Sequence, residues 1–477
     1  MNAKGVMHLT VSSLAFMLSG YIVNIWLGKK FGPGDYGIYG VIISLMTMIN
    51  IIQTSGLPQA ASRFIAAKPE SAEDVLHAAL RAQILSTIGI SFLFFMLSRP
   101  LALLLNDISL MPYIEATSLI LPFYSVFALY TGYYNGLHNF RKQAMMYIIY
   151  SGVKLVAVIG LIYVFHLYGA IIGFIIAPLA ALLFGSHLPR STAEGDGLSR
   201  RLIVFSLPLI GFAVLSTLLI SVDLFFVKSL LAEGQAAGLY TASQNIARIP
   251  YFALAAFAAV LFPTVARSMA REEARETGKK IRDNLRYLLL LLIPSTALIM
   301  MTSADVLRLM YSSSYLPAAA SLSWLALGLA FISIFVILAN VINAAEKPST
   351  SMLIAAIGVG VTSLFCFLLV PERGFSGAAL ATTAGGAVTM LLALIAVARR
   401  FPRIIPWSGS AKMMVAALGM YAAHAALHFS FILLPLSYLV LLGIYALVLV
   451  ILGEIGRADI SAIKALLPRR APLINLD

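Results

Sequence analysis

Apolar runs long enough to cross a bilayer recur along this chain from Leu9 to Gly453, and mostly short polar connections separate them. A membrane-spanning helix needs about 20 predominantly apolar residues, so each such run is a candidate crossing. Of the 477 residues, 60% are hydrophobic and 11% are charged, whereas a soluble domain carries roughly 25% charged residues. The sequence therefore predicts an all-α, polytopic membrane protein with no stretch left over for a sizeable soluble domain.

The apolar runs and the residues that break them predict about fourteen transmembrane helices. The first run is too long for the apolar region of a signal peptide, so we expect it to be retained as a helix. The expected helices lie near residues 8–28, 37–57, 76–98, 112–134, 144–166, 168–188, 202–227, 238–264, 284–302, 318–343, 349–370, 375–398, 411–429 and 431–453.

The distribution of Lys and Arg indicates the orientation. With the N-terminus inside, six of the 33 basic residues fall on the outer side, two lie within predicted helices and 25 fall on the inner side. Such an excess marks the cytoplasmic side, so we expect an inner (plasma) membrane protein with both termini in the cytoplasm. The net charge of +13 then belongs to cytoplasmic loops and predicts no binding of nucleic acid. The basic run from Arg267 to Arg286 contains acidic residues and is interpreted as a solvated loop, with contact to lipid headgroups as the alternative.

Short sequence echoes about 200 residues apart indicate an internal duplication. Gly37-Ile38-Tyr39 is echoed by Gly238-Leu239-Tyr240, and Tyr168-Gly169-Ala170 by Ser376-Gly377-Ala378. The offset spans six predicted helices, an even number, so both copies would enter the membrane from the same side as parallel repeats. We therefore expect a six-helix bundle in residues 1–190, a second in 191–403, and helices 13 and 14 with a cytoplasmic tail in 404–477. The substrate site would lie between the two bundles.

Several short motifs, in this order and spacing, resemble a known family. They are Phe31-Gly-Pro-Gly-Asp-Tyr-Gly-Ile-Tyr39, Gly56-Leu-Pro-Gln-Ala-Ala-Ser-Arg-Phe-Ile-Ala66, Gly238-Leu-Tyr-Thr-Ala-Ser-Gln-Asn-Ile-Ala-Arg-Ile-Pro250, Leu261-Phe-Pro263, Lys347-Pro348 and Gly374-Phe-Ser-Gly-Ala-Ala379. Over nearly the whole chain they resemble the bacterial polysaccharide-biosynthesis exporters of the multidrug/oligosaccharidyl-lipid/polysaccharide (MOP) flippase superfamily. The resemblance implies a transporter, not an enzyme, that flips a polyprenyl-pyrophosphate-linked oligosaccharide from the inner to the outer leaflet by alternating access. The first two predicted helices hold no arginine, which favours the broader polysaccharide-exporter branch over the lipid II flippases proper.

Two basic residues inside predicted helices are the main candidates for substrate binding, because a charge near the bilayer centre costs about 2.5–3.5 kcal/mol. Lys154 and Arg248 each lie about ten residues from a predicted helix end. We expect them to present positive charge to the pyrophosphate in a wet cavity, where Arg can bind two oxygens at once. The resemblance also implies a cationic position on helix 8 just before Ile-Pro, which Arg248 occupies. The alternative is that both residues pair with Asp223 or with helix carbonyls.

Two further polar residues are weaker candidates. Asp223, near the outer end of helix 7, either binds a coupling ion, sodium or a proton, or anchors the helix at the interface. Asn24 lies in the first repeat, close to the position that corresponds to Asp223 in the second repeat. It either contacts substrate or joins helices by hydrogen bonds. His424 and His428 are one helical turn apart, but their helix holds no carboxylate or thiol, so we expect no metal site. The sequence also holds no cofactor-binding motif.

Two other functions are compatible with the same composition. A membrane-embedded polysaccharide polymerase or glycosyltransferase would use the same lipid-linked sugars, but it would need a larger extramembrane loop and a cluster of catalytic groups, which the sequence lacks. A multidrug or cation antiporter of the same superfamily would favour an acidic or aromatic cavity. The two intramembrane cations favour an anionic substrate instead.

Overall fold

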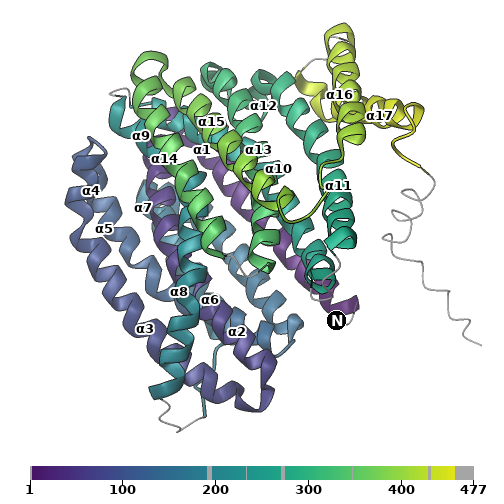
Figure 1. The fold of residues 1–477 in the computed structure, drawn as a ribbon. Helices are drawn as coiled ribbons and strands as arrows, with labels where there is room; N and C mark the ends of the chain where they lie inside the picture. The colour runs from purple at the N-terminus through teal and green to yellow at the C-terminus, as the bar shows by residue number, and fades with distance from the viewer. Residues whose placement is uncertain are drawn as a thin grey trace, which may run out of the picture.

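The computed structural model describes residues 3–190, 196–231, 234–269, 274–345, 348–427 and 431–456. Every regular element in these ranges is a helix, as the sequence predicts (Figure 1). In these ranges nine helices are long and apolar enough to cross a membrane, or ten if the bent pair Ile108–Ser118 and Ile120–Gly136 forms one span. The chain is therefore an all-α, multi-pass membrane protein.

The helices differ from the fourteen predicted segments because some are fused and others are broken. Short breaks of one to a few residues separate several neighbouring pieces. In chain order the elements are α1 (Ala3–Ser55), α2 (Leu57–Ala67), η1 (Pro69–Ser71), α3 (Ala72–Met96), α4 (Ser98–Leu104), η2 (Ile108–Leu110), α5 (Met111–Ser118), α6 (Ile120–Gly136), α7 (Phe140–Gly185), α8 (Asp196–Leu219), α9 (Val222–Leu230), α10 (Ala236–Met269), α11 (Ala274–Met301), α12 (Ser303–Met310), η3 (Ser313–Ala318), α13 (Ala319–Ala344), α14 (Pro348–Arg373), α15 (Phe375–Ala398), α16 (Trp407–Leu427), η4 (Phe431–Leu433) and α17 (Leu434–Ile451).

The long element α1 is a helical hairpin. Its only non-helical residue is Gly32, with φ 69° and ψ −178°, a conformation that glycine adopts without steric cost. Asn24 and Tyr36 would be about 18 Å apart along a straight helix. Instead, the hydroxyl of Tyr36 donates to Oδ1 of Asn24 at 3.4 Å, so the chain folds back at Gly32. Pro33 begins the second arm, where the missing N–H of proline costs no helical hydrogen bond.

The element α7 folds back in the same way at His166, whose φ is 48° and ψ −132°. Gly173 and Val158 would be about 22 Å apart along a straight helix. A methyl group on Gly173 would lie only 2.9 Å from the backbone nitrogen of Val158, so the two arms pack against each other. The sequence predicted two separate helices here, and the tight corner at His166 explains why they form one continuous element.

The corner at His166 has a counterpart 208 residues later in the chain. The helices α14 and α15 meet at Gly374, whose φ is 60° and ψ −148°. A methyl group on Gly377 would lie 2.3 Å from the carbonyl oxygen of Leu369, just as one on Gly169 would lie 2.3 Å from that of Leu161. The local geometry therefore repeats at the offset that the sequence echoes indicated. The boundaries of the two bundles themselves stay a prediction.

The predicted helix 202–227 is interrupted, which corrects the sequence interpretation. The first piece, α8, ends at Leu219 and the second, α9, begins at Val222. At the break, the backbone nitrogens of Ile220 and Ser221 bond three residues back, at 3.3 and 3.1 Å, which tightens the last turn. Neither Gly nor Pro marks this position, so the sequence contains no signal for the break.

Helices from both halves of the chain pack in the middle of the bundle. The helices α3, α4 and α5 lie at one edge, and α16 and α17 lie at the opposite edge (Figure 1). Where α1 crosses α10, a methyl group on Gly37 would lie 2.8 Å from the nitrogen of Gly238. The glycines of the first sequence echo thus contact each other, and only their lack of side chains allows this approach.

The C-terminal helices α16 and α17 pack against α11 through an apolar cluster that includes Leu298, Met420 and Leu441. Polar contacts join α17 to α11 at both ends. The hydroxyls of Thr302 and Tyr438 lie 2.7 Å apart, and Nε of Arg286 donates to Oε1 of Glu454 at 2.6 Å.

Candidate functional site

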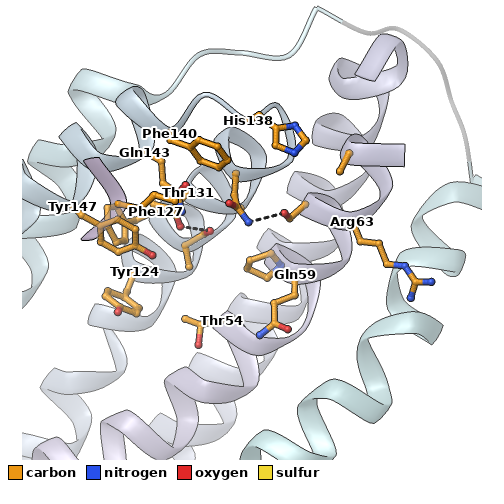
Figure 2. Close-up of a pocket in the computed structure, with 17 residues that line it drawn as sticks. Thr54, Gln59, Arg63, Tyr124, Phe127, Thr131, His138, Phe140, Gln143 and Tyr147 are labelled. Atoms are coloured by element: carbon orange, nitrogen blue, oxygen red, sulfur yellow. Dashed lines mark hydrogen bonds between the residues drawn. The ribbon is translucent and has the colours of Figure 1, made fainter. Parts of the chain in front are cut away.

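A cavity of about 710 Å³ lies between α2, α6 and the start of α7 (Figure 2). Small residues bring these helices together: a methyl group on Gly132 would lie 2.4 Å from the carbonyl oxygen of Pro58. Amide, hydroxyl and aromatic side chains form its walls, with two side chains that can carry positive charge. The most polar and aromatic of the lining residues are Gln59, Ser62, Arg63, Tyr124, Phe127, Thr131, Asn135, His138, Gln143 and Tyr147.

A second cavity of about 290 Å³ adjoins the first, because Thr54 and Tyr124 line both. It lies deeper among α1, α6 and α7, and Lys154 and Asn24 line it. The structure thus brings together two of the three substrate-binding residues that the sequence predicted. The two cavities are thus neighbours, one near the polar ends of α2 and α6 and the other beside Lys154.

The ammonium group of Lys154 is buried, and no described residue provides it with a counter-ion. The residue is 3% exposed, and its Nζ lies 5.0 Å from the ring centre of Phe16 and 5.4 Å from that of Tyr150. Within the described ranges it forms no salt bridge, and its pairing with Asp223, one of the alternatives, is not observed. Aromatic faces attract a cation, but they do not neutralise it. Lys154 can therefore supply uncompensated positive charge to a group in the second cavity.

Arg248 lies elsewhere, at the break between α8 and α9. Its guanidinium donates to the carbonyl oxygen of Ile220 and, at 3.2 Å, to Oγ of Ser221. Its Nε is buried and has no hydrogen-bond partner. Arg248 lines neither of the two cavities, so in this conformation it contacts helix carbonyls, as the alternative interpretation proposed.

Asn24 is part of a hydrogen-bonded network that joins the two halves of the chain. Nδ2 of Asn245, on α10, donates to Oδ1 of Asn24 at 3.3 Å and to the hydroxyl of Tyr36 at 2.7 Å. The hydroxyls of Tyr36 and Tyr311 lie 3.1 Å apart. Asn24 therefore faces the cavity and also connects α1 with α10, and Asn245 lies one helical turn before Arg248.

Asp223 is 1% exposed, so protein encloses its carboxylate. Its carboxylate accepts hydrogen bonds from the hydroxyls of Tyr240 and Thr382, both at 2.6 Å, and from Nε2 of Gln244 at 2.7 Å. The backbone nitrogen of Leu224 donates a fourth at 2.8 Å. The sequence suggested an interfacial position because Asp223 is near the end of helix 7, but α10 and α15 cover it.

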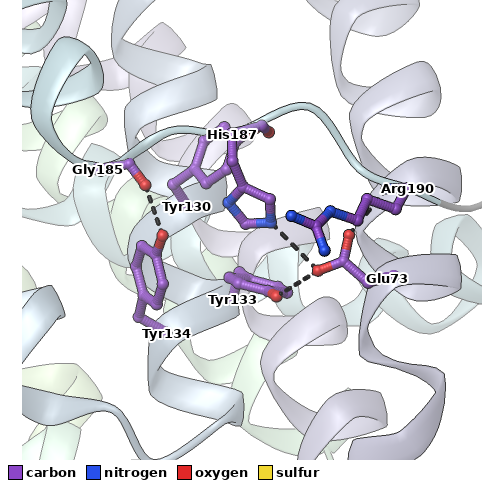
Figure 3. Close-up of polar contacts among 7 residues, drawn as sticks. All are labelled: Glu73, Tyr130, Tyr133, Tyr134, Gly185, His187 and Arg190. Carbon is purple, nitrogen blue, oxygen red and sulfur yellow. Dashed lines mark hydrogen bonds and ion pairs between the residues drawn. The ribbon is translucent and has the colours of Figure 1, made fainter.

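A polar cluster at the end of α7 attaches the start of the connection between the two halves (Figure 3). Oε1 of Glu73 lies 2.8 Å from the hydroxyl of Tyr133 and 3.2 Å from Nε2 of His187, and Oε2 accepts from the backbone nitrogen of Arg190 at 3.0 Å. The hydroxyl of Tyr134 donates to the carbonyl oxygen of Gly185 at 2.5 Å. The segment after α7 is therefore held on α3 and α6.

Sequence reasoning missed the polar lining of the larger cavity. Gln59 and Arg63 are one turn apart on α2, and Asn135 on α6 donates to Oγ of Ser62 at 3.0 Å. Such spacing places polar groups on one helical face and was the available signal. Of the two histidines weighed as a metal pair, His428 lies outside the described residues.

An all-helical, multi-pass chain that encloses polar cavities between its helices has the architecture expected of a membrane transporter. The model of the family described as polysaccharide biosynthesis protein matches residues 2–269, more than half of the chain, and the chain belongs to this family. Stage V sporulation protein B of Bacillus subtilis (strain 168) is 22% identical over 444 residues, which are 84% of this chain and 84% of that protein.

Two solved structures share the fold. Lipid II flippase MurJ, in an inward closed conformation, aligns with a TM-score of 0.74 and 17% identity, over 95% of this chain and 99% of that one. An inward-facing multidrug resistance MATE family transporter of the MOP superfamily aligns with a TM-score of 0.69 and 15% identity, over 83% of this chain and 98% of that one. The fold is thus that of MOP-superfamily transporters.

Proposed function

We propose that the protein flips an anionic, polyprenyl-pyrophosphate-linked oligosaccharide from the inner to the outer leaflet by alternating access, for cell-surface polysaccharide or cell-wall biosynthesis. The observation that carries this proposal is the buried ammonium of Lys154, which faces a cavity and has no counter-ion among the described residues. A membrane-buried charge normally faces a partner or a water-filled cavity. The pyrophosphate of the substrate would be that partner.

The lining of the two cavities matches the parts of such a substrate. The pyrophosphate would lie near Lys154 and Asn24 in the deeper cavity. The larger cavity offers the amides of Gln59 and Gln143 for sugar hydroxyls and the ring of Tyr147 for the apolar face of a sugar. The prenyl tail would remain in the lipid.

Arg248 remains part of the proposed site, in a different conformation of the protein. Its unpartnered Nε shows that its present contacts leave one donor unused. A pyrophosphate could replace Ile220 and Ser221 as its acceptor, because an anionic oxygen binds guanidinium more strongly than a carbonyl does. This exchange of hydrogen bonds would couple the conformation of the break between α8 and α9 to the binding of substrate.

Asp223 is proposed to bind the coupling ion, sodium or a proton. The hydroxyls of Tyr240 and Thr382 can rotate to present oxygen, and the amide of Gln244 can present its carbonyl, which together with the carboxylate gives the oxygen ligands that a hard cation requires. A proton would instead neutralise the carboxylate.

We further propose fourteen crossings in two six-helix halves, residues 1–190 and 191–403, followed by residues 404–477, with both termini in the cytoplasm. The hairpins in α1 and α7, the matching corners at His166 and Gly374, and the positive-inside asymmetry support this arrangement. Reporter domains fused after residue 190 and at the C-terminus should both report cytoplasm, and an external signal from either would overturn the orientation.

Two other functions remain as alternatives. The likeness to a MATE transporter is compatible with multidrug or cation export, but the cavity that Lys154 lines would repel a cationic drug. A membrane-embedded polymerase or glycosyltransferase is less compatible, since the fold is that of MOP-superfamily transporters.

The experiment is a flipping assay in proteoliposomes. A fluorescent polyprenyl-pyrophosphate oligosaccharide is placed in both leaflets, and a soluble lectin or quencher measures how fast the inner pool reaches the outside. The protein should accelerate this exchange, whereas a neutral glycolipid of equal sugar content should not exchange faster. Acceleration of both lipids would show nonspecific scrambling, and export of a cationic dye alone would favour the antiporter.

A further inference from the structure

A basic groove separate from the two cavities of the candidate site lies between the first turns of α11 and the segment that joins α15 to α16. Two neighbouring cavities of about 580 and 500 Å³ form it, and Arg282 and Arg403 line both. Neither shares a lining residue with the cavities around Lys154. The remaining charged lining residues are Arg275, Lys279, Asp283 and Arg286.

The charge of the groove is only partly compensated. Arg286 is paired with Glu454, and Oδ1 of Asp283 lies 3.8 Å from Nε of Arg282. In the part of the chain that the structure describes, Lys279 and Arg403 form no ion pair. The groove therefore holds an excess of positive charge that an anion would neutralise.

The backbone at Arg403 is unusual and helps to form the groove. Its φ is 57°, in the left-handed region that costs about 1–2 kcal/mol for a residue with a side chain. The preceding segment lies against α11, because a methyl group on Gly278 would be 2.6 Å from the carbonyl oxygen of Pro402. Phe401 and Ile404, which flank Pro402 and Arg403 in the sequence, are both buried. Two buried anchors thus hold a strained turn that carries an exposed arginine in the groove.

Trp407 places the groove at the surface of the membrane. It is 75% exposed, lines the groove and begins α16, one of the helices that pack on the apolar part of α11. Exposed tryptophans concentrate at the headgroup level of bilayers. The positive-inside orientation that we propose puts this end of α11 in the cytoplasmic leaflet, where anionic lipids are enriched.

We propose that this groove binds the phosphate headgroup of an anionic glycerophospholipid of the inner leaflet. The phosphate lies between Lys279, Arg282 and Arg403, and the glycerol and acyl chains run past Trp407 along α16. Binding here holds the start of α11 at the membrane surface. The inference rests on the proposed orientation but not on the proposed substrate. The flipping assay tests the residues around the two cavities of the candidate site, and none of these residues forms the groove.

Trp407 itself gives a direct test, because the chain contains only three tryptophans. In a Trp26→Phe, Trp324→Phe background, Trp407 is the sole tryptophan. The full-length protein is reconstituted in vesicles of phosphatidylcholine with an equal small fraction of brominated phosphatidylglycerol or brominated phosphatidylcholine. We expect the anionic lipid to quench Trp407 as if it bound more tightly, by about fivefold for each basic side chain that it contacts.

Variants identify the residues responsible. Arg403→Gly removes the cation and suits the positive φ, so it should fold normally and lose most of the preference for anionic lipid. Lys279→Gln should lower the preference further. Arg141→Gln, a matched loss of charge at an exposed position at the start of α7, should leave it unchanged. Equal quenching by the two lipids in the parent protein would overturn the proposal. Loss of the preference on adding millimolar inorganic phosphate would assign the groove to free phosphate and also overturn it.

Discussion

Replacing Lys154 with methionine should separate its role in transport from any role in folding. Methionine is an unbranched side chain of similar length, so the packing against Phe16 and Tyr150 is retained. Removing the buried charge recovers about 2.5–3.5 kcal/mol of stability. Losing the attraction between the cation and the two ring faces costs about 2 kcal/mol. The variant should therefore be as stable as the parent or more stable by about 1 kcal/mol.

Transport should change in the opposite direction. A charge-assisted hydrogen bond to a pyrophosphate contributes about 1.5–3 kcal/mol, which corresponds to a rate lower by about 10- to 150-fold when it is lost. The initial flipping rate is measured in proteoliposomes, and the melting temperature is measured on the same preparation in detergent. A stabilised protein that does not transport is the result that a purely structural lysine cannot produce.

The control is Lys30→Met. Lys30 also has its Nζ over an aromatic ring, 4.8 Å from the centre of Tyr163, but it is exposed and lines neither cavity. This variant should transport normally. A parent-like rate for Lys154→Met would refute the assignment of Lys154 to the substrate. A large fall in its melting temperature would show that the ammonium is needed for folding.

Three further predictions concern other polar contacts. Arg248→Ala should abolish glycan export at normal protein level and membrane insertion, and Arg248→Lys should be partly active; normal export by the alanine variant would remove Arg248 from the site. Asp223→Asn should fold, because the hydroxyls around it can also accept hydrogen bonds, but flipping should no longer respond to a sodium or pH gradient; an unchanged response would exclude Asp223 as the coupling site. Burial alone would raise the pKa of Asp107, but hydrogen bonds from Lys228 and Ser109 lower it below its usual value, so the ion pair with Lys228 stabilises the protein above about pH 4 and is lost as the pH falls further. The destabilisation caused by Asp107→Asn, about 1 kcal/mol at pH 7, should thus diminish as the pH falls below about 4, and a difference independent of pH would contradict this.

The sequence was sufficient for the fold class and for part of the site. Long apolar runs predict membrane helices because backbone groups in lipid must bond within the same segment. The predicted gaps at residues 29–36 and 167 also coincide with the corners at Gly32 and His166, although a hairpin whose arms pack closely has almost no polar connection between them. The break at Ile220 was invisible, because the groups that satisfy it come from Arg248, which is 28 residues away.

The larger cavity escaped prediction for a related reason. Gln59, Asn135 and Gln143 lie near the ends of predicted helices, where polar residues are ordinary, so their helical spacing was only a weak signal. They line one cavity only because Gly132 lets α6 pack closely against α2. Contacts between helices thus determine which polar residues share a cavity, and one sequence does not contain that information.

Lys154 and Arg248 look equivalent in the sequence, but the structure gives them different partners. Each is a cation within a predicted apolar helix, and insertion costs apply to both. Arg248 meets this cost by donating to backbone oxygen freed by a helix break, so its charge contributes to the fold in this conformation. Among the described residues, Lys154 has its ammonium over two aromatic faces and forms no ion pair, so under the proposed function its cost is met when an anion enters the cavity. A ligand shifts a conformational equilibrium only by its different affinity for the two states. An anion that draws Asn24 from Asn245 and Arg248 from Ile220 would supply that difference, because both contacts cross between helices that alternating access must move.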